Sequence, residues 1–85
     1  MSNKSMMDIE KYKEKCNEIL EIINSNNEKM HLQLSQDLIQ SNKIFIEEIL
    51  KRLNSVDIIL QYENNWFGSV LEFINIIFKM YLQYK

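Results

Sequence analysis

Glu28 and His31 are the residues of this 85-residue sequence whose spacing comes nearest to a known chemistry. On a helix, residues three positions apart project from one face, and Glu-x-x-His pairs of this kind bind di-iron in helical bundles. One such pair per chain supplies too few ligands. Even when doubled by dimerisation, it would need inward-facing Glu residues from other helices. We therefore expect this pair to lie on a solvated surface.

Other catalytic groups are scarce. His31 is the single histidine and the only candidate general base, and no Ser or Cys stands at an interpretable spacing from it. A glycine-rich phosphate loop is excluded because the chain contains one glycine. Cys16 is the only cysteine, so we expect a buried structural thiol and no internal disulfide. The sequence predicts no catalytic residues, no cofactor and no metal, and therefore not an enzyme.

The composition predicts one domain over residues 1–85. With 46% hydrophobic and 26% charged residues, the chain reads as globular, and no run of about 20 apolar residues is available to span a bilayer. Residues 1–7 contain one lysine and no continuous apolar stretch, so we expect no cleavable signal and a cytoplasmic protein. The net charge of −2 and the single arginine, Arg52, argue against nucleic acid as a partner.

Apolar periodicity predicts an all-α fold, a small antiparallel three-helix bundle or helical hairpin with helices at about 5–24, 26–63 and 69–84. In the first helix, apolar residues recur at steps of three and four, at Ile9, Tyr12, Cys16, Ile19 and Ile23. A turn is expected at 24–27, where Asn and Ser side chains compete for backbone hydrogen bonds and Ser25 with Glu28 forms a capping box.

The middle helix is predicted from a heptad-like series: Leu32, Ile39, Ile46, Ile49, Leu53, Val56 and Leu60. Ser35 and Asn42 interrupt this coiled-coil-like seam, and a break near 41–42 is the four-helix alternative. A continuous helix of about 36 residues would be ~54 Å long, about twice the length of its neighbours. Apolar surface would then stay open along it, and a two-fold homodimer would cover that surface.

The last predicted helix is apolar around most of its circumference. Its polar residues, Glu72, Asn75, Lys79 and Gln83, fall on a stripe only about 80° wide, which leaves about 280° apolar. A peripheral helix needs an apolar stripe of little more than ~100°, so we expect a second copy, a partner protein or a membrane surface to cover the rest. The predicted partner or dimer interface consists of Trp66, Phe67, Val70, Phe73, Ile74, Ile77, Phe78, Tyr81 and Tyr84.

Trp66-Phe67-Gly68, expected between two helices, resembles the Trp-x-Gly signature of the WXG100 family. The resemblance covers about "NNWFGSVLEF" and implies a helical-hairpin dimer exported by a type VII secretion system. That family has the motif near the middle of about a hundred residues, whereas this chain has it at 66 of 85. The alternative is an aromatic residue packing at a turn, with a glycine that permits a positive φ.

These patterns predict a small non-enzymatic interaction protein, a regulator, inhibitor or adaptor that binds a partner protein through apolar helical surface. Its size, and the A/T-rich codon usage indicated by 13 Ile, 10 Asn and 9 Lys, suit a viral, phage or mobile-element origin. The WXG100-like secretion partner is the alternative function. An in-plane membrane anchor is less favoured, because the last helix has one internal lysine and one at its end to attract anionic lipid.

Overall fold

The part of the chain that the computed structural model describes is all-helical and contains no strand, as expected from the periodicity. The backbone is described for residues 2–54 and 65–85, and the side chains for residues 9–54 and 68–85. The helices are α1 (Ser2–Asn24), α2 (Glu28–Gln33), α3 (Gln36–Leu53) and α5 (Asn65–Leu82). The end of the predicted middle helix, with Val56 and Leu60, lies outside the described residues.

The turn between α1 and α2 falls where the Asn-rich stretch predicts it. Asn26 adopts φ 59°, a left-handed conformation that Asn tolerates better than most residues. The cap of α2 is Asn27, whose Oδ1 accepts a hydrogen bond from the Met30 amide at 3.0 Å. Ser25 instead donates its hydroxyl to the Ile22 carbonyl oxygen at 2.6 Å. The predicted Ser25–Glu28 capping box is therefore wrong, because the observed cap, Asn27, lies two residues after Ser25.

The predicted middle helix is broken, but not at 41–42. Leu34 and Ser35 are extended, with ψ 139° and 152°, and Ser35 Oγ caps α3 by accepting from the Leu38 amide at 3.1 Å. Ser41 and Asn42 lie inside α3. The break turns α2 out of line with α3, so Leu32, a predicted seam residue, is 87% exposed.

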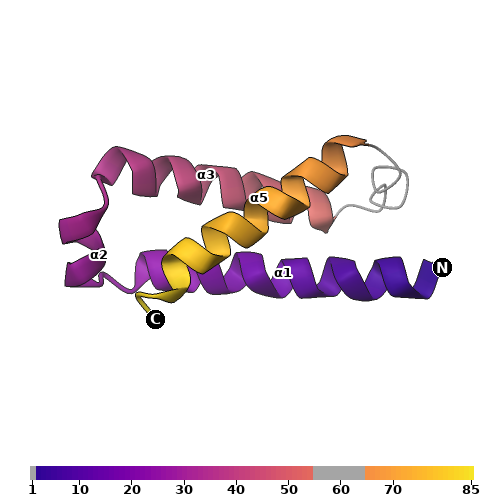
Figure 1. Cartoon of the computed structure of the whole chain (residues 1–85), viewed down its shortest axis with the longest axis horizontal. Helices are drawn as coiled ribbons and strands as arrows, with labels where there is room; N and C mark the ends of the chain where they lie inside the picture. Colours follow the sequence, from indigo (N-terminus) through magenta and orange to yellow (C-terminus); the bar gives the residue numbers. More distant parts are fainter. Residues whose placement is uncertain (1, 55–64) are drawn as a thin grey trace.

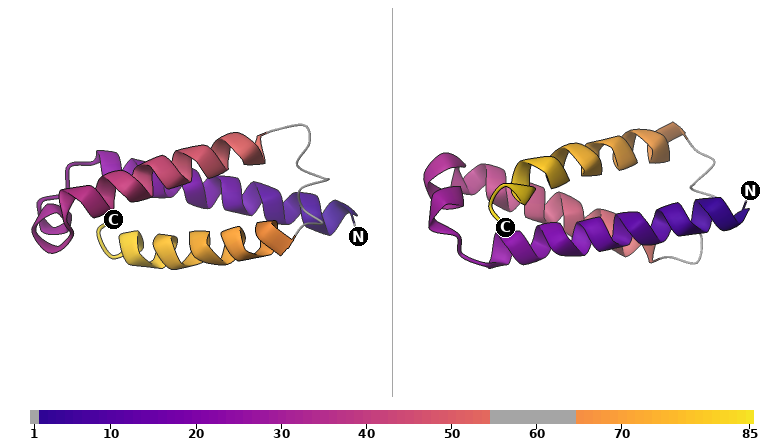
Figure 2. Two further views of the ribbon diagram at one scale, coloured as in Figure 1. Left: turned by 90° about the horizontal axis from the view of Figure 1, so that it is seen from above. Right: turned by 60° about the horizontal axis from the view of Figure 1, so that its bottom comes forward.

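The helices form an elongated bundle of 43 × 20 × 18 Å. α3 runs antiparallel to α1, with α2 turning the chain at one end, and α5 crosses both helices obliquely (Figure 1). Two further views show α5 on one side of the pair, with the C-terminus close to the end of α1 (Figure 2). α1 packs against both α3 and α5, whereas α3 and α5 approach each other less closely within the described residues.

The core lies along α1, where the three longer helices meet. Among the side chains of residues 9–54 and 68–85, the buried apolar ones are Ile9, Cys16, Ile19, Ile22, Ile23, Met30, Ile39, Ile46, Ile49, Leu53, Val70, Leu71, Ile74, Ile77, Tyr81 and Tyr84. Ile9, Cys16, Ile19 and Ile23 are four of the five predicted for the first helix, and the fifth, Tyr12, packs partly buried against the core. Burial of each large apolar side chain contributes about 1.5–3 kcal/mol.

α5 buries one part of its apolar arc against its own chain and leaves another part exposed. Because α5 lies across both α1 and α3, it buries a set of residues that span about 120° of its circumference: Val70, Leu71, Ile74, Ile77 and Tyr81. Among the described side chains of α5, residues 68–82, the large apolar ones that stay exposed are Phe73, Ile76 and Leu82. A binding partner would therefore need to cover a narrower part of α5 than the apolar arc predicted from the sequence.

Candidate protein-binding surface

A polar cluster fixes α5 against α1. Lys15 Nζ donates to Asn75 Oδ1 at 2.6 Å, and Asn75 Nδ2 donates to Tyr12 Oη at 3.2 Å. The Lys15 ammonium also lies 5.0 Å from the centre of the Tyr12 ring and 5.7 Å from that of Phe78. Asn75 was predicted to lie on the polar stripe, but it is half-buried in this cluster. Sliding α5 along α1 would leave these groups without partners, so the cluster sets the register of the two helices.

A second polar contact joins α5 to α3. Asn42 Nδ2 donates to Tyr81 Oη at 3.1 Å, and the Tyr81 side chain is fully buried. Burial raises the pKa of Tyr81, with a further rise from Tyr84, while the hydrogen bond from Asn42 opposes the shift. Asn42, which interrupts the predicted apolar seam, therefore satisfies the one polar atom of the largest buried side chain.

The last residues of the chain are held by the turn region. Tyr84 Oη donates to Gln33 Oε1 at 2.7 Å, and Asn27 Nδ2 donates to the Tyr84 carbonyl oxygen at 2.8 Å. Asn27 thus caps α2 with its oxygen and holds the chain end with its nitrogen. These bonds hold the residues that follow α5 against α2.

The predicted interface residues divide into three groups. Those buried among residues of the same chain are Val70, Ile74, Ile77, Tyr81 and Tyr84. Phe78 packs partly buried against the core, and Phe73 is 55% exposed. The side chains of Trp66 and Phe67 lie outside the described residues. A partner reaching the five buried residues would have to displace α1 or α3, so Phe73 is the described residue of the set that a partner can meet directly.

Phe73 belongs to an exposed apolar surface between α3 and α5. Its ring lies 5.4 Å, centroid to centroid, from that of Phe45, tilted by 55°. Residues three, four and seven apart share a helix face, which extends the surface along both helices. From this spacing we group Leu38, Phe45, Phe73, Ile76 and Met80 as the α3/α5 surface, whose two helices are joined by the contact between Phe45 and Phe73. Ile76 is its most exposed member at 64%, and Phe45 and Met80 are half-buried.

Four of these residues are missing from the interface predicted from the sequence: Leu38, Phe45, Ile76 and Met80. A signal for Phe45 was present, because it is apolar, precedes the seam residue Ile46 and therefore lies beside the core face. Ile76 lies at the edge of the polar stripe, about 40–60° around the helix from Glu72 and Lys79, which also placed it outside the core face. Which neighbouring helix lies beside these residues was not readable from periodicity.

Trp66-Phe67-Gly68 lies in the first turn of α5, because this helix begins at Asn65 and not near Ser69. Gly68 does not adopt a positive φ, and a Cβ at this position would meet nothing within 4 Å. Both readings of the motif placed it in the connection between two helices, and that placement is wrong. The backbone here requires no glycine.

The groups considered for chemistry have different surroundings. Cys16 is fully buried, and burial raises the pKa of its thiol to about 11, so the reactive thiolate is disfavoured at neutral pH. His31 Nδ1 lies 2.9 Å from Gln36 Nε2, and Glu28 is exposed at the start of α2. Within the described residues no three His, Cys, Asp or Glu side chains gather as metal ligands.

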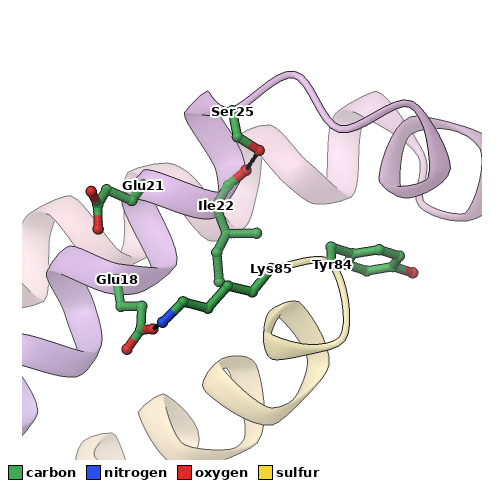
Figure 3. Close-up of a pocket in the computed structure, with 6 residues that line it drawn as sticks. All are labelled: Glu18, Glu21, Ile22, Ser25, Tyr84 and Lys85. Carbon is green, nitrogen blue, oxygen red and sulfur yellow. Dashed lines mark hydrogen bonds and ion pairs between the residues drawn. The ribbon is translucent and has the colours of Figure 1, made fainter.

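An open recess lies where the chain end meets the second half of α1 (Figure 3). It is lined by Glu18, Glu21, Ile22, Ser25, Tyr84 and Lys85. Lys85 forms an ion pair with Glu18, which raises the pKa of Lys85, and the Ser25 hydroxyl is bonded to Ile22. The polar groups are thus paired or, as with Glu21, exposed to solvent, so the recess holds no buried polar group awaiting a ligand.

Comparison of the chain with protein families, with curated proteins and with solved structures finds no match. The helices of the described residues include none that combines the length and hydropathy needed to cross a bilayer.

Proposed function

We propose that this chain is a non-enzymatic interaction protein, a regulator, inhibitor or adaptor, that binds a protein partner through the α3/α5 surface. The observation that carries the proposal is the exposure of Phe73 and Ile76 beside the half-buried Phe45. Contiguous exposed apolar side chains of this kind mark binding sites more often than isolated ones do. Aromatic residues also bring large contact area at low entropic cost.

The shape of the bundle supports this location. α3 and α5 each pack closely on α1 but less closely on one another, so their facing edges leave apolar side chains between two helices. A helix laid along two such edges buries its own apolar stripe and theirs together. Covering Phe73 and Ile76 would recover a large part of the ~1.5–3 kcal/mol available to each side chain on full burial.

Site-specific photocrosslinking tests the proposal. We would place a benzophenone amino acid at position 76, or at position 44 as the control, and express each variant in the native host. The exposed fraction of Ile44, 52%, is similar to the 64% of Ile76. Ile44 lies ~100° around α3 from Phe45, however, and so faces away from the α3/α5 surface. We expect a discrete protein adduct from position 76 and none from position 44.

The complex that the adduct identifies must then be reconstituted from the purified chain and the purified partner. We expect Ile76→Ser to weaken binding of the identified partner by at least about tenfold, and Ile44→Ser to leave it unchanged. Equal adducts from both positions, or no adduct from position 76, would contradict the proposal. Binding between the purified proteins that is weakened as much by Ile44→Ser as by Ile76→Ser would also contradict the proposal.

A further inference from the structure

We propose that the partner on the α3/α5 surface is a second copy of this chain, with α5 packed antiparallel against α5 of the copy around a two-fold axis at Ile76. This inference rests on the proposed function, because it uses the same surface. It adds the identity of the partner, its orientation and the residues that pair.

The exposed face of α5 has two edges of different chemistry. At ~100° per residue, Glu72 and Lys79 lie about 40–60° to one side of Ile76, and Phe73 and Met80 lie about as far to the other side. One edge is therefore charged and the other apolar, with Ile76 between them. Each edge has one residue before Ile76 and one after it.

The proposed two-fold axis runs between the two α5 helices at Ile76, perpendicular to the helices and parallel to the exposed face. This axis makes the face complementary to itself. The axis reverses the helix direction but keeps each edge on its own side, so charged edge meets charged edge. Glu72 precedes Ile76 by four residues and Lys79 follows it by three, which places Glu72 beside Lys79 of the copy. Phe73 comes beside Met80 of the copy in the same way, and symmetry forms every pair twice.

A parallel dimer lacks this match. Its two-fold axis runs along the helices and brings the charged edge of one copy against the apolar edge of the other. Glu72 would then face Phe73 of the copy, and Lys79 would face its Met80, so charged groups would lose water without gaining a partner. The distribution of residues on α5 therefore selects the antiparallel arrangement.

The surroundings of α5 support the same assembly. Glu72 and Lys79 are exposed and form no ion pair within the part of the chain that is described, so both are available to the copy. On the apolar edge, Phe73 contacts Phe45 of α3, which brings α3 to that side in both copies. The apolar edge is thereby widened by Phe45 from each chain.

Charge exchange tests the pairing. Dimer dissociation constants would be measured by sedimentation equilibrium for Glu72→Lys, Lys79→Glu and the double variant. We expect each single variant to raise the Kd about tenfold, equivalent to about 1.4 kcal/mol, because both symmetric pairs become like-charge contacts. The double variant restores the pairs and the affinity, and an equimolar mixture of the single variants forms a heterodimer. Glu47→Lys, an equal charge change on the far side of α3, is the control.

Disulfide trapping tests the orientation. Ser69 and Gln83 are exposed and each lies seven residues from Ile76, on opposite sides, while the native Cys16 is fully buried. A mixture of Ser69→Cys and Gln83→Cys chains should cross-link to each other on mild oxidation, and neither should cross-link to itself. The reverse pattern would overturn the antiparallel arrangement.

A protein that stays monomeric at high concentration overturns the second copy as partner. If position 76 still forms a specific adduct with a different protein, the proposed function stands while this inference fails. If no adduct forms, both fail. A dimer that is indifferent to charge exchange but weakened by Ile44→Ser uses another surface, and it too overturns the inference.

Discussion

Ile74 and Ile76 provide a matched test of how α5 is oriented. They are the same residue type, two positions apart on one helix, and Ile74 is fully buried whereas Ile76 is 64% exposed. Replacing a buried Ile by Ala removes about three carbons at ~0.8 kcal/mol each, and the cavity left behind raises the loss to about 3–4 kcal/mol. For Ile76 only about a third of that side chain is covered, so the loss is ~0.8 kcal/mol, and the higher helix propensity of Ala reduces it to about 0.5 kcal/mol.

The measurement is urea denaturation followed by far-ultraviolet circular dichroism, at a protein concentration below the Kd of the proposed dimer. We expect Ile74→Ala to lower the free energy of unfolding by several times more than Ile76→Ala, with equal m-values. At high concentration the effect of Ile76→Ala should grow, because the proposed dimer would then contribute to stability. Losses that are equal within about 0.5 kcal/mol at low concentration would refute the orientation of α5.

Three further predictions concern the Cys16 thiol, the hydrogen bond between Asn42 and Tyr81, and the Ser35 cap of α3. Raising the pH from 8 to 10 should lower the free energy of unfolding by about 1.4 kcal/mol more in the native chain than in Cys16→Ala, because the thiol ionises near pH 9 when unfolded and near 11 when folded; equal pH slopes would contradict the assigned burial. A double-mutant cycle of Asn42→Ala and Tyr81→Phe should give a coupling energy of about 0.5–1.5 kcal/mol in urea titrations, and additive losses would show that their hydrogen bond contributes nothing. Ser35→Ala should cost about 1 kcal/mol through loss of the α3 cap and Ser35→Asp should restore it, whereas a loss that Asp fails to rescue would assign the effect to something other than capping.

Much of the secondary structure was predictable because it depends on local sequence. The steps of three and four from Ile9 to Ile23 identified the buried face of α1, and the Asn-rich stretch located the first turn. The break before α3 was missed because Ser35 lies on an apolar seam and is followed by Leu38, not by the Glu or Gln of a capping box. Asp37 in the first turn of α3 was the available signal for a helix start.

The candidate surface was harder to predict because it depends on which helices are neighbours. Periodicity reports how much of α5 is apolar but not that α1 and α3 cover it from two sides. Tyr81 and Ile74 therefore looked available for a partner, although they belong to the core. Asn75 was misplaced for a similar reason, since its partners Lys15 and Tyr12 are more than fifty residues away in sequence.

The position of α1 between α3 and α5 also determines how this chain comes apart. Because α3 and α5 each pack more closely on α1 than on one another, detachment of α5 would break its contacts with α1 and leave most of the packing of α1 on α3 intact. Amide hydrogens of α5 should therefore exchange with solvent sooner than those in the middle of α1. A chain opened in this way presents the vacated groove to the detached helix of another molecule, so reciprocal exchange of α5 is the least costly route from this fold to an intertwined oligomer.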